Sequence, residues 1–381
     1  MRLSFLCHEF PPTGGGAASA LDHFTRVLAT RGHQVQILTI GLGGQTQREA
    51  LHDRQVIRYG VGRKNLLSPT VWELLRSYWA LRFRSSKDLK AFKPDCSVAF
   101  FAFPAGHAIL KQRRAITGPI AVSIRGSDIP GFSKKRWGLF QMLQPWLTHP
   151  VLRGSDRIFA NGETLAGLTR AFEPDVEVMS IPNGVDTTLF HPAPGMVGAH
   201  GGPLKVLSVG QLIARKRVTQ LLEGAAHVAK QGRKLEITIA GSGPLEQALK
   251  AQAAQLPEAI KVYFSGHTSR EAMPQLYREH DLLVHLSGAE GVSNVALEAL
   301  ASGLPMIATP EALGPEFMDG EGTLVVENPT GSAIGDALLV LDGDHHKLAH
   351  MHSAARQQAE SFDWNRACGL FEAQMSRMWL A

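Results

Sequence analysis

The pattern that most restricts the fold of this chain is an alternation of short apolar runs with longer segments of helical periodicity. Such alternation is typical of βαβ units, in which helices join parallel strands. The first half has strand-like runs at residues 3–7, 34–40, 97–101, 120–124 and 157–160, and helical patterns at residues 18–30, 70–92 and 139–152. The second half has strand-like runs at residues 206–209, 236–240, 262–265, 282–285, 306–308 and 324–326. We predict an α/β protein with two doubly wound sheets.

Two sheets imply two domains, and the 381 residues suffice because a domain averages roughly 150 residues. Three prolines and four glycines crowd the end of residues 186–203, and this composition continues neither a strand nor a helix. We therefore expect an N-terminal domain at 1–185, a linker at 186–203 and a C-terminal domain at 204–361. Residues 362–381 form an amphipathic helical pattern, which needs an apolar surface to pack on.

Composition excludes several classes of protein. No apolar stretch approaches the ~20 residues of a membrane-spanning helix, and the first residues become polar too soon for a signal peptide. We therefore expect a cytoplasmic protein. Cys7, Cys96 and Cys368 are far apart and odd in number, which indicates buried free thiols and neither a disulfide framework nor a zinc site.

The charge of the chain differs between its halves. Residues 1–196 carry 24 Lys and Arg against 14 Asp and Glu, a net of +10, whereas residues 197–381 carry 15 against 20, a net of −5. A basic half suits nucleic acid, anionic lipid or a phosphorylated acceptor, and sign does not choose among them. Within it, residues 63–93 interleave eight basic residues with apolar ones. This pattern suits either an ordinary basic surface helix or one that lies on an anionic membrane.

Three loops that follow strands could hold phosphate. Gly14, Gly15 and Gly16 precede a helix, as do Gly241 and Gly243, so backbone amides could face an anion. Flexible turns are the alternative for both. After Gly210 and Gln211, the run Arg215-Lys216-Arg217 places three cations between a strand and a helix, where they suit a pyrophosphate or form a solvated basic turn.

A fourth loop and its helix contain two glutamates eight residues apart, Glu290 and Glu298. Ser293 or Asn294 caps the helix, and Gly303 ends it. Glu298 lies among Val, Ala and Leu, so its carboxylate needs hydrogen-bond donors such as the vicinal hydroxyls of a ribose. At 1.5 Å per helical residue, the two carboxylates would be roughly 12 Å apart, about the reach from ribose to hexose across a pyrophosphate.

The Glu-x7-Glu pair resembles the signature of retaining family 4 glycosyltransferases of the GT-B fold. The resemblance extends to Pro11-Pro12, to residues 182–186 (Pro-Asn-Gly-Val-Asp), to Lys216 and to Trp364, and thus covers nearly the whole chain. It implies two Rossmann-like domains facing across a cleft, with the donor held mainly by the second and the acceptor by the first. It also implies that the C-terminal helix packs back on the N-terminal domain.

The resemblance also implies roles for individual residues. Glu298 would bind the ribose hydroxyls and Glu290 the donor sugar, while Lys216 and Arg215 would neutralise the leaving diphosphate. Donor binding would further involve the segments with Ser293 and Asn294, Gly241 and Gly243, and Gly210 and Gln211. Gly14, Gly15 and Gly16, together with Asp128, would line the site for donor phosphates or the acceptor. The reaction would be a hexosyl transfer with retention, without metal or other cofactor; the nucleotide diphosphate sugar is the donor substrate.

Two residues depart from the family pattern. The chain has Arg125-Gly126-Ser127-Asp128 where many relatives begin with His, and Gln211 where many have Arg. Because Arg is always charged, Arg125 cannot act as a general base. It either binds an anionic donor or acceptor group at the catalytic centre or forms a structural pair with Asp128.

Three functions follow from these patterns. The first is transfer of a sugar to a lipid-linked or polysaccharide acceptor in cell-envelope or exopolysaccharide synthesis, by an enzyme peripheral to the inner face of the cytoplasmic membrane and without a nucleic-acid partner. The second is a related GT-B enzyme acting on small soluble molecules. The third is a non-catalytic sugar-nucleotide binder that lost turnover through Arg125 and Gln211.

Overall fold

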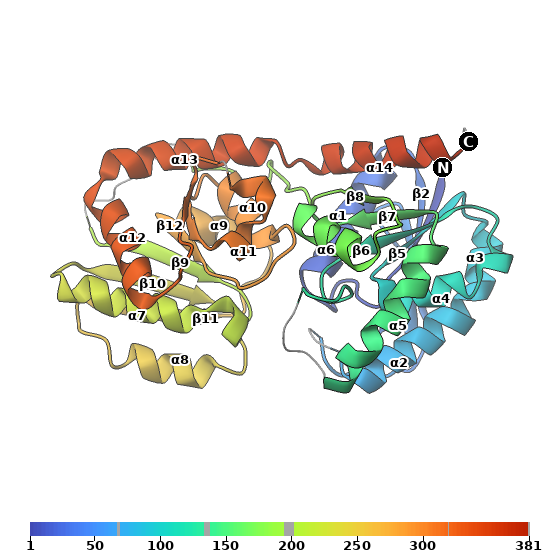
Figure 1. Cartoon of the computed structure of the whole chain (residues 1–381), viewed down its shortest axis with the longest axis horizontal. Coiled ribbons are helices and arrows are strands. Elements are labelled where there is room, and N and C mark those ends of the chain that lie inside the picture. Colours follow the sequence, from blue (N-terminus) through green and yellow to red (C-terminus); the bar gives the residue numbers. More distant parts are fainter. Residues whose placement is uncertain (67–68, 133–137, 194–201, 319, 380–381) are drawn as a thin grey trace. The chain divides into compact units, whose positions relative to one another are not determined.

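The structure is a computed structural model that describes residues 1–381 except 67–68, 133–137, 194–201, 319 and 380–381. The chain forms two compact units. The first contains Met1–Asn183 together with Trp364–Ala381, and the second contains Gly184–Asp363. Each unit has its own mainly parallel sheet, as the strand and helix pattern predicts (Figure 1).

The sheet of the first unit has the order β3-β4-β2-β1-β5-β6-β7-β8. Its strands are β1 (Arg2–Leu6), β2 (Gln34–Gly41), β3 (Gln47–Leu51), β4 (Arg54–Gly60), β5 (Cys96–Phe100), β6 (Ile120–Ile124), β7 (Arg157–Ala160) and β8 (Val178–Ser180). The central strands β5 and β6 are buried along their whole length. This burial explains their uninterrupted apolar composition, because helices cover both faces of a parallel sheet.

The sequence pattern predicts five strands for this half and misses three, which are β3, β4 and β8. Strand β3 is almost entirely exposed and pairs antiparallel with β4 at the edge of the sheet. An exposed edge strand has no buried face, so it carries polar residues such as Arg48 and Glu49 and shows no apolar run. Strand β8 has only three residues, too few to show a periodicity.

Helices flank this sheet on both sides. They are α1 (Gly16–Thr30), α2 (Val71–Trp79), α3 (Ser85–Phe92), α4 (His107–Leu110), α5 (Gly138–Gly154), α6 (Glu163–Phe172) and α14 (Trp364–Trp379). A π-helical turn, Ala80–Arg84, joins α2 to α3, so the predicted helix at 70–92 is nearly continuous. The helix α14 belongs to this unit and packs on α1, where the rings of Phe371 and Phe24 lie 5.3 Å apart.

The sheet of the second unit is wholly parallel, in the order β11-β10-β9-β12-β13-β14. Its strands are β9 (Leu204–Val209), β10 (Leu235–Ala240), β11 (Ile260–Gly266), β12 (Leu282–His285), β13 (Met306–Ala308) and β14 (Thr323–Val325). Its helices are α7 (Val218–Lys230), α8 (Glu246–Ala253), α9 (Met273–Arg278), α10 (Asn294–Ala301), α11 (Pro310–Leu313), α12 (Gly331–Gly343) and α13 (His345–Glu360). All six predicted strands of this half are confirmed.

The boundary between the units lies between Asn183 and Gly184, and the start of the expected linker belongs to the second unit. Phe190 is buried there against Tyr277, with ring centroids 5.9 Å apart. Arg356 donates hydrogen bonds to the carbonyl oxygens of Thr187 and Phe190. Side-chain packing therefore anchors residues that composition alone assigns to a linker; residues 194–201 lie outside the described part of the chain.

Candidate functional site

The second unit brings two charged loops together at the carboxyl ends of β9 and β12. These strands are neighbours, although the chain forms β10 and β11 between them, so the strand order changes direction here. Such a switch point is where doubly wound sheets bind their ligands. The amide of Gly288, after β12, donates a 2.9 Å hydrogen bond to the carbonyl oxygen of Arg215, after β9.

Glu290 is the centre of this site. Its Oε1 accepts hydrogen bonds from Lys216 Nζ at 2.6 Å, Ser287 Oγ at 2.6 Å and Arg215 Nη1 at 2.9 Å. Burial raises the pKa of Glu290, but Lys216 and Arg215 outweigh this effect and bring it down to about 2. The site thus holds an ionised carboxylate between two cations, which could exchange part of this pairing for an incoming phosphate.

Two further residues of the site, His285 and Ser287, were not singled out from the sequence. His285 is buried at the end of β12, where burial and the charge of Lys216 lower its pKa to about 3, so the ring is neutral. Ser287 bonds Glu290 and also accepts a hydrogen bond from Arg215. Their position at the end of a strand that leads to the Glu290 loop was the signal available in the sequence.

Glu298 lies on α10, apart from the Glu290 cluster. Its Oε2 accepts a 3.0 Å hydrogen bond from the hydroxyl of Tyr277 on α9. Burial raises the pKa of Glu298 to about 7, although the Tyr277 hydrogen bond acts in the opposite direction. The hydroxyl of Ser293 caps α10 by accepting from the amide of Ala296, and Asn294 is the first residue of the helix.

The glycine loops of the second unit approach one another closely. A Cβ at Gly241 would lie 2.0 Å from the carbonyl oxygen of Gly210, and both glycines have a positive φ, +137° and +147°. A Cβ at Gly243 would lie 2.5 Å from the carbonyl oxygen of Leu212. These positions therefore require glycine for backbone packing. Gln211 is exposed and makes none of the side-chain hydrogen bonds of the Glu290 cluster.

The predicted glycine loop of the first unit follows β1 and begins α1. Gly14 has a φ of +95°, and a Cβ there would lie 2.7 Å from Glu9 Cβ. Gly15 precedes the helix and Gly16 is its first residue. The amide of Gly14 donates a 2.7 Å hydrogen bond to the carbonyl oxygen of Leu66, which ties the loop to the segment before α2.

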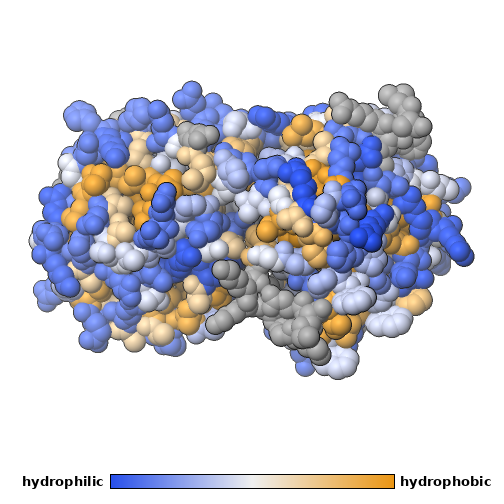
Figure 2. Space-filling model, in the orientation of Figure 1, coloured by the Kyte–Doolittle hydropathy of each residue, from blue (hydrophilic) through white to orange (hydrophobic). Residues whose placement is uncertain are grey.

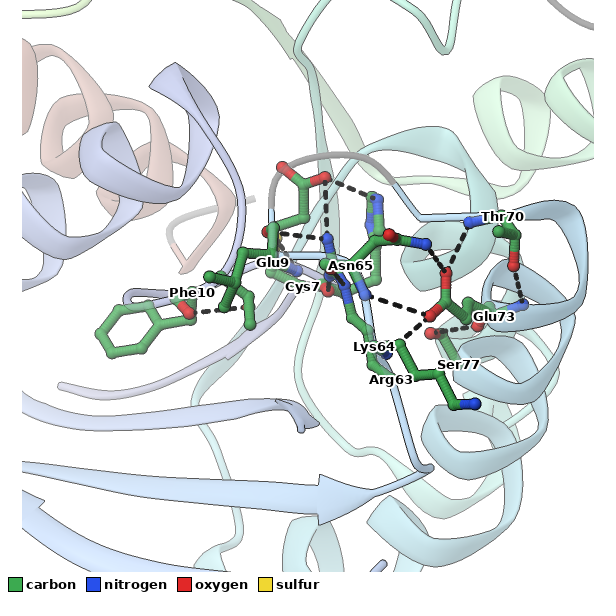
Figure 3. A network of polar contacts seen from close by, with 12 residues as sticks. Cys7, Glu9, Phe10, Arg63, Lys64, Asn65, Thr70, Glu73 and Ser77 are labelled. Carbon is green, nitrogen blue, oxygen red and sulfur yellow. Dashed lines mark hydrogen bonds and ion pairs between the residues drawn. The ribbon is translucent and has the colours of Figure 1, made fainter. Parts of the chain in front are cut away.

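Two buried charges organise that segment, as Figure 3 shows. Arg63 donates hydrogen bonds to the carbonyl oxygens of His8, Asn65 and Leu66. Glu73 accepts from the amides of Lys64 and Thr70 at 2.8 and 2.7 Å, and its own amide bonds the Thr70 hydroxyl, which completes a capping box. Burial raises the pKa of Glu73, but these amides outweigh it and lower the pKa to about 2.

Arg125 and Asp128 interact through the backbone. The Asp128 carboxylate accepts hydrogen bonds from the amides of Ala102, Arg125 and Gly126. The Arg125 guanidinium instead donates to Asn183 Oδ1 at 2.7 Å and lies 4.8 Å from the centroid of the Phe100 ring. Arg125 and Asp128 thus pair through the amide of Arg125, while the guanidinium bonds Asn183 and not the Asp128 carboxylate.

Comparison with known proteins agrees with this arrangement. Residues 14–189 match the family described as Glycosyltransferase Family 4, and residues 196–358 match glycosyl transferases group 1. The chain is 25% identical, over 93% of both proteins, to the GDP-mannose-dependent alpha-(1-6)-phosphatidylinositol monomannoside mannosyltransferase of Mycobacterium tuberculosis. It is 30% identical to a D-inositol 3-phosphate glycosyltransferase of Nocardia farcinica, over 60% of this chain and 54% of that protein.

Solved structures share the fold over the whole chain. Sucrose-phosphate synthase from Thermosynechococcus elongatus has a TM-score of 0.80 at 18% identity and covers 100% of this chain and 99% of its own. The two Rossmann-like units with mainly parallel sheets are thus those of the GT-B fold.

Proposed function

Because this chain belongs to glycosyltransferase family 4, we propose that it transfers a hexose from a nucleotide diphosphate sugar to a lipid-linked or polysaccharide acceptor. The observation that carries the proposal is the Glu290 cluster at the switch point of the second sheet. Lys216 and Arg215 would stabilise the charge that develops on the leaving diphosphate, and Glu290 would contact the sugar. The transfer proceeds with retention and needs no metal, since these cations take the place of one.

A row of exposed side chains on the first unit supports an acceptor at a membrane surface. Trp72, Arg76, Trp79 and Phe83 follow one another at intervals of three or four residues, so they share one face of the helical segment. Trp72 is 74% exposed, and Trp79 and Phe83 are each 57% exposed. Aromatic and basic residues on one face are typical of helices that lie in a lipid headgroup region.

The helix α5 adds apolar side chains nearby. Leu143 and Trp146 are exposed, and α5 packs on the segment 102–110 that also contacts α2. On the face drawn in Figure 2, hydrophilic areas alternate with several apolar ones. Within the described residues, no helix is long and apolar enough to cross a bilayer. We infer reversible attachment through α2 and α5, in keeping with the phosphatidylinositol-linked acceptor in the name of the mycobacterial relative.

The transfer reaction is tested by supplying a panel of nucleotide sugars and measuring the release of nucleoside diphosphate, with and without a lipid-linked acceptor. We expect one donor to be hydrolysed slowly and to turn over faster with acceptor, at the same rate in EDTA. Loss of activity in EDTA and its recovery with manganese would contradict the metal-free mechanism. Tight nucleotide binding without turnover of any donor would favour the non-catalytic alternative.

Membrane attachment is tested by sedimentation with vesicles of phosphatidylglycerol and phosphatidylcholine. Replacing Trp72 and Trp79 by Ser should weaken binding about tenfold or more, because two large apolar side chains no longer leave water. The matched control is Tyr263→Ser, which removes an aromatic side chain of 51% exposure from the second unit. Binding should also fall steeply as the salt concentration rises, because salt screens the attraction between basic residues and anionic lipid beyond about 10 Å at 0.1 M. Equal binding by all variants would refute attachment through α2.

A further inference from the structure

A small cavity lies inside the first unit, at the carboxyl ends of β5 and β6. Its volume is about 30 Å³, and its lining includes Phe100, Ser123, Arg125, Asn183, Trp364 and Phe371. A cavity of this size holds one or two water molecules or the end group of a ligand, and it is too small for a sugar ring. Arg125 is the charged residue of this lining.

The guanidinium of Arg125 is incompletely satisfied by the protein. Its Nη2 bonds Asn183, but its Nε is buried and has no hydrogen-bond partner among the described residues. Within the part of the chain that the structure describes, no carboxylate forms an ion pair with this guanidinium. Three backbone amides already hold Asp128, which contributes the largest favourable charge interaction with Arg125.

The charge of Arg125 nevertheless persists at neutral pH. Burial lowers its pKa only to about 10, an effect that Asp128 partly opposes. Cys7 offers no counter-charge, because burial raises the pKa of its thiol well above the usual range. A buried cation without a direct ion pair is unfavourable, and a bound anion would relieve this cost.

We propose that Arg125, with Ser123 beside it in the cavity lining, forms a subsite for the anionic end of a substrate, a carboxylate or a phosphate group. A guanidinium has only donors, arranged in a planar fork that matches both groups. The cavity that Arg125 lines restricts the anion to a small end group. This subsite makes Arg125 a specificity-determining residue. The existence of the subsite is independent of the proposed function, whereas the assignment of the anion to a substrate rests on that function.

Binding of the anion is measured without turnover, with inorganic phosphate and acetate as probes. The protein used is the Arg215→Gln, Lys216→Gln double variant, which lacks the two cations that contact Glu290. By calorimetry, we expect at least one probe to bind this double variant saturably. Adding Arg125→Gln should weaken binding about tenfold or more, whereas Asn183→Ala should leave it within a few-fold.

A merely structural Arg125 predicts a different result. Removing either partner of the Arg125–Asn183 hydrogen bond would then lower stability similarly, and neither would change anion binding. Failure of both probes to bind the double variant, or equal binding after Arg125→Gln, would overturn the subsite. If Arg125→Gln does not fold, bromide-soaked crystals of the unaltered protein provide the test by anomalous diffraction. A bromide peak beside Arg125 Nε supports the subsite, and its absence overturns it.

The source of the anion is decided by paired substrates. One arm compares a nucleotide hexuronic acid with the corresponding nucleotide hexose, and the other compares a phosphorylated acceptor with its neutral form. The preference in kcat/KM for the anionic member of one pair should fall about tenfold in Arg125→Gln. Unchanged preferences in both arms would overturn the substrate role. Absence of any turnover would count against the proposed function, and the anion-binding measurement would stand.

Discussion

Glu290 is the residue at which we expect a substitution to affect nucleotide binding and turnover differently. Because it pairs with both Lys216 and Arg215, it would compete with a donor phosphate for these cations. Glu290→Gln should leave nucleoside diphosphate affinity unchanged or higher, while turnover falls by about 100-fold, as when a transition-state contact is lost. Calorimetry with the diphosphate and initial rates measure the two effects. Glu311→Gln, beside Arg217 and half exposed, is the control that should keep both values.

Glu298→Gln should behave in the opposite way. If Glu298 binds the ribose, loss of a charge-assisted hydrogen bond worth roughly 1.5 to 3 kcal/mol weakens nucleoside diphosphate binding about tenfold or more. Equal losses of affinity in the Glu290 and Glu298 variants would show that the pair has only a structural role. Full activity of Glu290→Gln would contradict the donor-site assignment.

The raised pKa of Glu298 also predicts a pH dependence. With a pKa of about 7, its carboxyl is protonated below neutrality and can no longer accept a hydrogen bond at both oxygens. Nucleoside diphosphate affinity should therefore fall as the pH drops from 8 to 6. The fall should be shallower in Glu298→Gln, a comparison that cancels titration of the nucleotide itself. Parallel profiles would exclude Glu298 as the titrating group.

The raised pKa of Glu298 also determines how its contribution to the free energy of unfolding changes with pH. A carboxyl with a raised folded-state pKa lowers stability above that pKa, so the contribution of Glu298 improves as the pH falls from 7 towards 4.5. Glu290 acts oppositely, because its stabilisation is present above 4.5 and is lost towards pH 2. Urea unfolding can measure the free energy of unfolding of each Gln variant relative to the unaltered protein across this pH range. Plotted against pH, the differences for the two variants should have slopes of opposite sign.

At the level of elements, one side chain connects the glycine loop to α2. Glu73 holds the segment that starts at Lys64, and the carbonyl oxygen of Leu66 in this segment accepts from Gly14. The exposed aromatic side chains on α2 are thereby tied to the loop that precedes α1. A change at Glu73 should affect both.

We expect Glu73→Ala to lower the free energy of unfolding by about 1–3 kcal/mol, because buried amides lose a charged acceptor. Hydrogen exchange should accelerate at the amides of Lys64 and Gly14. The control is Glu258→Ala, an exposed acid of the second unit, for which the change should stay within about 0.5 kcal/mol. Unchanged exchange at Gly14 in Glu73→Ala would mean that the two segments are independent.

At the level of the whole molecule, the last helix completes a core formed by the first residues. Phe371 and Met375 on α14 are buried with Phe5 and Phe24, and Arg31 and His33 bond Glu372. The first unit is thus built from both ends of the chain. Its stability should depend on α14.

Phe371→Ala should cost about 3–5 kcal/mol, the usual price of deleting a buried aromatic ring. Leu370→Ala, at an exposed position of the same helix, should cost less than about 0.5 kcal/mol. In Phe371→Ala, hydrogen exchange should quicken in β1 and stay unchanged in β9, since β9 belongs to the other unit. Equal acceleration in both strands would show that the two units unfold together.

Local chemistry was sufficient to predict much of this protein. Buried parallel strands must be apolar along their length, so nearly all of them were visible as runs, and the three cysteines are buried and free as their spacing indicates. The Glu290 loop and its capped helix were also recognisable. The signals in these cases are contained in neighbouring residues, because periodicity and capping depend on only a few positions along the chain.

Tertiary structure alone decided which charges meet. The joining of Glu290 to Lys216, 74 positions away, depends on the order of β9 and β12 in the sheet. The pairing of Glu298 with Tyr277 and the contact of Arg125 with Asn183 likewise follow from packing between elements. The edge strand β3 has no apolar face, so only its pairing with β4 reveals it. Contacts over such separations are set by strand order and burial, which no local pattern of residues contains.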